Sequence, residues 1–485
     1  MKGTWLAPVA IAVPAFLAAW IVWQATAQGV TFTPDGITYL EAARSFGREN
    51  RLWMLTDCGL SHDWLNYLGP WYPALLGSGM KVGLEPFAWT RALNILCAVI
   101  ATASAAWGAL RISGSAVAAA LAGCAIALLP ASTASYRAML SEPPYLALVL
   151  LGWLALSIGT SGGPAWTVRA AAVAFGLAAA TRYAALPLPF AAAVFLWWTM
   201  RRLRPAIEFV AVALIPTILF AAVRLRFSGS EPPREFAFHP PRWSDLAETV
   251  KTLVGWLGVH VSATWGAILL AVLLGSLILL LALPGKLASG AGLALLLLST
   301  HLIAILGAKT FFDTSIEIQL PRQLLLLFPL GVLALCGALQ PRLLIAALAM
   351  LAAIHVRAGL HPQPVQAMYN SNSPEWRDSE TLARIGEITP AACVYTNAPD
   401  VVYRRYEQHA EWLPQPTAWF TGHAMPWCDI AKKDLARHPR SVYVFFDAHL
   451  TSSPSVSEAE LTGCLTRLTR VRLRDGTILL PEPGS

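Results

Sequence analysis

The chain has 485 residues, of which 56% are apolar and only 13% are charged, and its mean hydropathy is +0.54. A typical soluble domain has about 25% charged residues, and one water-facing fold could not bury this apolar surplus. The composition also excludes disordered, collagen-like, coiled-coil and disulfide-framework proteins. Much of the net charge of +7 lies in short loops between apolar runs, which is typical of membrane orientation signals and not of nucleic-acid binding. The sequence therefore predicts an all-α polytopic membrane protein that contacts membrane lipids and no nucleic acid.

Apolar runs of about 20 residues, the length that crosses a bilayer, recur through the first 357 residues. Small residues after the first run resemble a signal-peptide cleavage site, but the run is longer than a usual signal core, which favours a retained anchor. We predict about eleven membrane helices, near residues 5–27, 86–110, 114–131, 143–160, 166–181, 185–200, 205–226, 262–283, 287–307, 320–339 and 342–357.

Lysine and arginine residues predict the orientation. With the N-terminus inside, the basic loops face the cytoplasm, and Arg201, Arg202 and Arg204 provide the strongest signal. The loops 28–85 and 227–261 and the C-terminal tail then lie outside, and an odd number of spans agrees with this. We therefore expect a protein of a bacterial-type inner (plasma) membrane.

The tail has a different pattern, which predicts a small C-terminal α/β extracytoplasmic domain over 358–485 after a membrane domain over 1–357. Ser457 and Glu460 form a capping-box pair, and Asp475-Gly476 between two β-like runs indicates a hairpin. Strands are predicted at Ala392–Thr396, Ser441–Phe446, Val471–Arg474 and Thr477–Leu480, and helices at Ser379–Ile388 and Ser457–Leu468.

Four of the seven cysteines fall on the outer side, where oxidation is permitted. Three of these lie in the tail, so one disulfide is expected there, with the pairing left open. Buried thiols are expected for the three cysteines in membrane spans. The outer cysteines are Cys58, Cys393, Cys428 and Cys464, and those in spans are Cys97, Cys124 and Cys336.

Charged residues gather at one predicted depth, the outer membrane boundary. Asp35 follows the first span, Glu142 begins the fourth, and Arg182 ends the fifth, while Arg137 and Arg322 lie at other outer span ends. Ionisable residues at such depth are candidates for function. Guanidinium groups fit phosphate oxygens, and a carboxylate can deprotonate an acceptor hydroxyl or amine. The alternative is that the arginines snorkel to lipid head groups and Asp35 caps a helix.

Short motifs in a fixed order carry a family resemblance across about residues 30–335. They are Asp35…Tyr39…Ala42, Gly69-Pro70-Trp71-Tyr72-Pro73-Ala74-Leu75-Leu76, Ser141-Glu142-Pro143, Gly176-Leu177-Ala178-Ala179-Ala180-Thr181-Arg182 and Arg322-Gln323. Together they resemble the GT-C superfamily of membrane glycosyltransferases. The resemblance is closest to the branch with protein O-mannosyltransferases and lipid A aminoarabinose transferases.

The resemblance implies a many-helix GT-C-like fold that uses a polyprenyl-phosphate-linked sugar donor. By analogy Asp35 is the catalytic base or orients the acceptor, and Glu142 is a second acid. Arg182 and Arg322 are expected to hold the donor phosphate. The remaining expected substrate-binding residues are Arg137, Tyr39 and Tyr72.

One departure from the family pattern leaves the acceptor open. Gly36 follows Asp35, so the adjacent Asp-Glu pair of the protein mannosyltransferases is missing. The expected activity is a hexosyl- or pentosyltransferase acting on a lipid, glycan or protein acceptor.

Other features of the outer side have two interpretations each. Asp57, His62 and Asp63, with Asp35 and Glu41, could bind a divalent cation, although solvation of the loop is favoured. Aromatic residues there could stack on sugars or form an interfacial belt. The run Tyr403-Arg404-Arg405-Tyr406 is expected to be solvated surface, and His301 a packing residue. The aromatic residues are Trp53, Trp64, Trp71 and Tyr72.

The rival hypothesis is a non-enzymatic transporter or lipid flippase with an outer sensor domain. Transporters usually place substrate-binding charges near the bilayer midplane and often have internal repeats. Here the acids lie at one surface and no repeat is evident, which favours the enzyme. A scaffold protein with a degenerate site is a third hypothesis.

Overall fold

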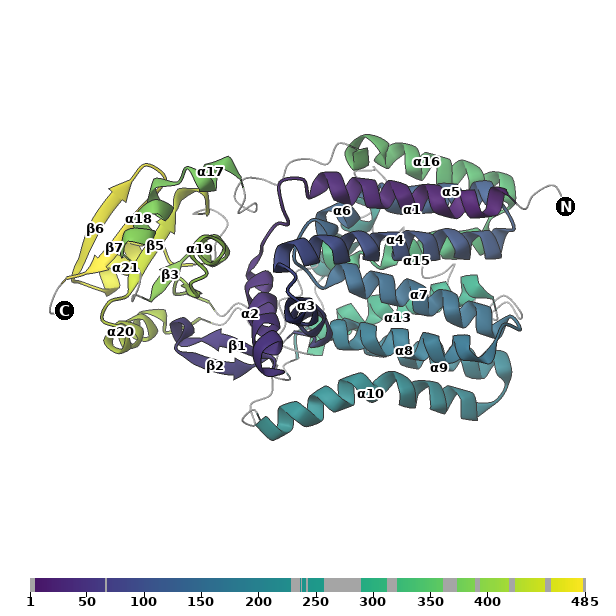
Figure 1. Cartoon of the computed structure of the whole chain (residues 1–485), viewed down its shortest axis with the longest axis horizontal. Helices are drawn as coiled ribbons and strands as arrows, with labels where there is room; N and C mark the ends of the chain where they lie inside the picture. The colour runs from purple at the N-terminus through teal and green to yellow at the C-terminus, as the bar shows by residue number, and fades with distance from the viewer. Residues whose placement is uncertain are drawn as a thin grey trace.

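The computed structural model describes residues 5–65, 68–227, 236, 238–240, 243–256, 289–311, 321–360, 373–388, 393–417, 424–449 and 455–482. A bundle of long helices occupies most of the molecule, and a smaller part with strands lies at one end of it (Figure 1). The N-terminus of the chain lies at the opposite end of the bundle (Figure 1).

Most of the long bundle helices are apolar around their whole circumference, so they must be buried against each other or against lipid. Trp153 is fully buried in this core and its indole N–H donates to the carbonyl of Gly290 over 3.0 Å. The helices are α1 (Leu6–Ala25), α4 (Pro86–Ser113), α5 (Ala116–Ala127), α6 (Pro130–Tyr136), α7 (Glu142–Thr160), α8 (Ala165–Thr181), α9 (Pro187–Met200), α10 (Leu203–Phe227), α11 (Trp243–Gly255), α13 (Gly290–Phe311), α14 (Pro321–Leu324), α15 (Leu327–Ala338) and α16 (Pro341–Leu360).

Within the described residues, six helices are long and apolar enough to cross a membrane. The pair α5 and α6, bent by 57°, would make a seventh span if it crosses as one unit. Helices α8 and α15 and the segment Pro341–Val356 of α16 are apolar but shorter. The predicted span 262–283 lies outside the described residues, so the number eleven stays a prediction.

The segment between α1 and α4 lies at the end of the bundle that faces the C-terminal strands (Figure 1). It contains α2 (Pro34–Glu49), β1 (Trp53–Thr56), the 3₁₀ turn Asp57–Gly59, β2 (Ser61–Trp64) and α3 (Trp71–Lys81). Thr33 caps α2 by accepting a hydrogen bond from the Gly36 amide over 3.2 Å, and Pro34 takes the first helical position. Helix α2 and the hairpin lie between the bundle and the C-terminal strands (Figure 1).

The C-terminal part contains a five-stranded sheet of order β4-β3-β5-β7-β6, in which β4, β3 and β5 are parallel and β7 is antiparallel to its neighbours. The strands are β3 (Val394–Thr396), β4 (Ala410–Trp412), β5 (Val442–Phe446), β6 (Leu468–Leu473) and β7 (Gly476–Pro481). The helices are α17 (Pro374–Arg377), α18 (Glu380–Ile388), α19 (Pro399–Tyr406), α20 (Trp427–Arg437) and α21 (Glu458–Cys464).

Local signals in this part were accurate. The capping box of Ser457 and Glu460 and the hairpin at Asp475-Gly476 are both confirmed. The helix predicted over Ser457–Leu468 is too long, because it ends at Cys464 and Leu468 already pairs with Pro481 in the sheet.

Two disulfides join the four cysteines that were predicted to lie on the outer side. Cys428 pairs with Cys464 inside the C-terminal part, which confirms the one expected there. Cys58 pairs with Cys393, across 335 residues, and this second disulfide was not predicted. It links the turn after β1 covalently to the start of β3. The cysteines in the bundle are free thiols.

Candidate active site

Four charged side chains from distant positions form one cluster. Arg322 Nη1 lies 2.9 Å from Asp35 Oδ2, and Arg182 Nη1 lies 2.7 Å from Glu142 Oε1. Arg322 Nε also approaches Glu142 Oε1 at 3.7 Å, which connects the two pairs. Acids and guanidinium groups therefore alternate in the order Asp35, Arg322, Glu142, Arg182.

Helix ends place these groups at one level of the molecule. Asp35 lies in the first turn of α2, and Glu142 is the first residue of α7, where the helix dipole favours an acid. Arg182 follows the last residue of α8 in extended backbone, and Arg322 lies in the single turn α14. The structure thus brings together the acids and two of the arginines that we expected to form the site.

The four side chains of the cluster differ in their exposure to solvent, and this difference indicates which of them a substrate can reach. The side chain of Glu142 is only 2% exposed, and a buried carboxylate is tolerated only with cationic partners, which Arg182 and Arg322 supply. Asp35 is 37% exposed, the highest value of the four. Asp35 is therefore the group that a molecule from outside meets first.

Tyr39 and Ser141 extend the cluster by hydrogen bonds. The Tyr39 phenol donates to Ser141 Oγ over 2.8 Å, and Arg182 Nη1 donates to the same oxygen over 3.2 Å. Burial, reinforced by the nearby Asp35 carboxylate, raises the pKa of Tyr39, so the phenol stays neutral and remains a donor. We did not predict a role for Ser141; its place directly before Glu142 was the available signal.

Two further expected binding residues, Tyr72 and Arg137, make contacts of a different kind. Tyr72 is fully buried on α3 and packs edge-on against Tyr39, with ring centroids 4.9 Å apart. Arg137 directly follows α6, and its backbone carbonyl accepts a hydrogen bond from the Thr31 amide over 2.8 Å. These contacts connect Tyr72 to Tyr39 of the site and Arg137 to the segment just before α2.

The first-loop residues that could have formed a metal site are separated in the structure. Among the described residues, no group of three His, Cys, Asp or Glu side chains is placed to hold a metal ion. Asp35 pairs with Arg322, Glu41 with His409, and Asp57 with His438 over 2.9 Å. The divalent-cation hypothesis therefore finds no ligand group in the described part of the chain.

The run beginning at Tyr403 was expected to be solvated surface, but only Arg405 of its four residues is exposed. Tyr403 is 2% exposed and stacks on Phe32, with centroids 5.8 Å apart. The Arg404 guanidinium lies 3.4 Å from the centre of the Phe87 ring. The reason is that α19 packs on the first-loop segment, a long-range contact with no local sequence signal. His301 is buried and contacts the Tyr145 hydroxyl at 3.2 Å, as expected of a packing residue.

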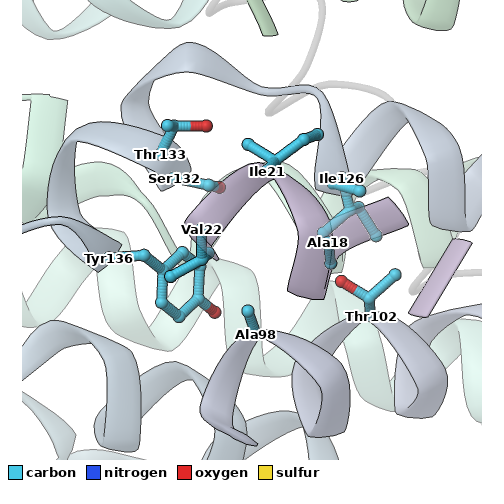
Figure 2. A pocket seen from close by; sticks show the side chains of 10 residues that line it. Ala18, Ile21, Val22, Ala98, Thr102, Ile126, Ser132, Thr133 and Tyr136 are labelled. Carbon is cyan, nitrogen blue, oxygen red and sulfur yellow. The ribbon is translucent and has the colours of Figure 1, made fainter. Parts of the chain in front are cut away.

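A small recess between α1, α4, α5 and α6 is shown in Figure 2. Its walls combine apolar side chains with hydroxyl groups from Thr102, Ser132, Thr133 and Tyr136. It shares no residue with the charged cluster, so it is a separate packing feature of the bundle.

Solved structures of ArnT from Cupriavidus metallidurans are similar to the whole chain. The apo form is 12% identical with a TM-score of 0.59, and the match covers 97% of each chain. The chain shares its fold with ArnT. The form of ArnT bound to undecaprenyl phosphate is 14% identical with a TM-score of 0.57, over 100% of this chain and 99% of that one.

Arabinosyltransferase EmbB from Mycobacterium smegmatis is a more partial match, 15% identical over 73% of this chain and 30% of that one, with a TM-score of 0.42. No protein-family model and no curated protein matches the sequence. The likeness to ArnT is one of fold, and it confirms the GT-C-like architecture that the motifs indicated.

Proposed function

We propose that this chain is an integral membrane glycosyltransferase that moves a sugar from a polyprenyl-phosphate-linked donor to an acceptor at the outer face of a bacterial-type inner membrane. The alternating cluster of Asp35, Arg322, Glu142 and Arg182 is the observation that carries the proposal. It lies where the bundle meets the first-loop segment, in a fold shared with ArnT, which has been crystallised with undecaprenyl phosphate.

The proposed reaction is a direct displacement at the anomeric carbon. An acceptor oxygen or nitrogen bonds to that carbon while its proton passes to Asp35. The bond between the carbon and the phosphate oxygen breaks, and its electron pair leaves with the lipid phosphate. The configuration at the anomeric carbon is inverted, because attack and departure occur on opposite faces.

The arginines would stabilise the charge that grows on the departing phosphate. A guanidinium has five N–H donors in a planar fork, so it can hold a carboxylate and a phosphate together. Arg322 directs Nη1 to Asp35 and Nε toward Glu142, and its Nη2 atom takes part in neither contact. Glu142 would keep both guanidiniums at fixed positions before the donor arrives.

The Cys58–Cys393 disulfide supports the outer location of the site. It joins the first loop to the C-terminal part, so both lie on the same side of the membrane. Disulfides persist in oxidising compartments, and the outer side of an inner membrane is such a compartment. The N-terminus at the far end of the bundle agrees with this orientation (Figure 1).

The test uses the purified full-length protein in lipid nanodiscs, radiolabelled polyprenyl-phosphate sugars and envelope extract from a strain lacking the gene. We expect transfer of label to an extract component, and we expect Asp35→Asn to slow it by about 10²–10⁴-fold, the usual contribution of a general base. Asp63→Asn, the same change at an exposed position of β2, is the control and should keep full activity.

Two results would contradict the proposal. Transfer by a folded Asp35→Asn protein at the wild-type rate would remove Asp35 from the chemistry. Movement of labelled lipid across vesicle membranes without any transfer would favour the transporter.

A further inference from the structure

The C-terminal part contacts the helix that carries Asp35. His409, beside strand β4, has Nδ1 at 2.7 Å from Oε1 of Glu41, a buried residue of α2. Its other ring nitrogen, Nε2, lies 3.3 Å from Oε1 of Glu411 in β4. One imidazole therefore bridges a carboxylate of α2 and a carboxylate of the sheet.

Backbone amides of the first-loop hairpin complete this bridge. The second oxygen of Glu41 accepts a hydrogen bond from the Leu55 amide over 3.0 Å, and Glu411 accepts one from the Cys58 amide over 3.1 Å. The Cys58–Cys393 disulfide lies beside the second of these bonds. The bridge is thus anchored on both sides, which fixes the positions of its carboxylates.

Helix α2 is held on two faces. On its bundle side Tyr39 donates to Ser141. On its outer side, besides Glu41, Arg44 pairs with Glu407 at 2.7 Å and donates to the Tyr403 hydroxyl over 3.2 Å. Asp35 precedes Glu41 by six residues, about 9 Å along the helix axis at 1.5 Å per residue.

We propose that the Glu41–His409–Glu411 bridge is a positioning clamp, which holds α2 so that Asp35 faces Arg322 and the acceptor. The proposal rests on the function given above, because it assigns the bridge a role in transfer by Asp35. None of the three residues touches the reacting atoms. They act through the placement of the helix.

Charge explains why the clamp is strong near neutral pH. Burial alone would lower the pKa of His409, but hydrogen bonds and the charges of Glu41 and Glu411 outweigh this and raise the pKa to about 9. Burial alone would raise the pKa of Glu411, but its contacts with His409 outweigh this, so the pKa is lowered. Both ring nitrogens therefore carry protons, and each donates to one carboxylate. Further titratable groups around this site are Asp57, Asp434, His438 and Tyr395.

The raised pKa of His409 determines how the stability of the folded form depends on pH. A histidine whose pKa rises from 6.5 to about 9 on folding stabilises the folded form fully below pH 6.5. The stabilisation is lost as the pH rises through about 9, because the imidazole then loses one of its two donors. The protection of α2 against hydrogen exchange should fall over the same range.

The experiment compares His409→Gln and Glu41→Gln with His438→Gln in the full-length protein. His438 is a matched control, because it pairs with Asp57 in the 3₁₀ turn and not with α2. We measure hydrogen exchange of residues 34–49 together with kcat and KM for sugar transfer. The two clamp variants should exchange faster in α2 and lose about 10- to 100-fold in kcat, with KM for the donor nearly unchanged. The control should change neither quantity.

Two results would overturn the clamp. A folded His409→Gln protein with wild-type exchange in α2 overturns the clamp, and so does faster exchange without a loss of kcat. If His409→Gln does not fold, Glu41→Gln, which keeps the shape of the side chain, provides the test. If the wild-type protein transfers no sugar, the proposed function fails, while exchange in α2 still shows whether the bridge holds the helix.

Discussion

Glu142 is the residue on which the charged cluster depends most. It is nearly inaccessible to solvent, yet it lies within ion-pair distance of two guanidiniums. Burying a charge is costly unless it is paired, and removing one partner leaves the other uncompensated. The cluster as a whole therefore adds little to the free energy of unfolding, but replacing any one of its members destabilises the protein.

We predict that Glu142→Gln destabilises the protein by about 3 kcal/mol, near the lower end for a broken buried ion pair because the arginines are partly exposed. Thermal unfolding followed by tryptophan fluorescence measures the change. The matched control is Glu208→Gln on α10, which removes an exposed pair with Arg204 of 2.7 Å. That pair should contribute under about 0.5 kcal/mol. Equal effects of the two substitutions would contradict the importance of burial.

At the scale of elements, the contact between α2 and α3 sets the position of Asp35. Gly77 on α3 faces the backbone of α2, and a Cβ atom added there would lie 2.5 Å from the carbonyl oxygen of Ala43. A backbone carbonyl cannot move aside as the end of a flexible side chain can. Any larger residue at position 77 must therefore push α2 and α3 apart. The glycine is required for this close approach.

Gly77→Ala should therefore destabilise the protein by about 1–3 kcal/mol, the usual cost of overpacking, and should lower sugar transfer by moving Asp35. Gly47→Ala on α2 is the control, because its added Cβ would meet Gly77 O at an ordinary 3.6 Å. A glycine-to-alanine change inside a helix is otherwise stabilising, by up to about 1 kcal/mol. The two melting temperatures should shift in opposite directions, and a common direction would argue against the crowding at Gly77.

At the scale of the whole molecule, one covalent bond joins the first loop to the C-terminal part. The Cys58–Cys393 disulfide has Cα atoms 5.3 Å apart and joins segments that are 335 residues apart in sequence. The Glu41–His409 contact and the stacking of Tyr403 on Phe32 lie along the same boundary. Any membrane orientation must therefore keep the first loop and the C-terminal part on one side.

We predict that side to be the outer one. A variant that retains only Cys58 and Cys393 should be labelled in intact cells by a membrane-impermeant maleimide, but only after reduction. A second variant that retains only Cys97, which is buried on α4, should stay unlabelled and serves as the control. Labelling of the first variant that requires permeabilised cells would place the site on the cytoplasmic side.

Much of this architecture follows from local patterns. Apolar runs, the capping box at Ser457 and the turn at Asp475-Gly476 act through residues close in sequence, so their consequences can be read before any fold is known. The predicted span ends also placed Asp35, Glu142 and Arg182 at one expected depth. Depth along a span is a property of one helix at a time, which is why the sequence could predict it.

Only the tertiary structure decided which of these groups touch. The link of Arg322 to both acids, the Cys58–Cys393 pair and the bridge through His409 depend on how helices and sheet pack around each other. Such contacts join residues hundreds of positions apart and leave no periodic trace in the chain. Their geometry is set by the shapes of all the packed side chains together, and not by any one segment.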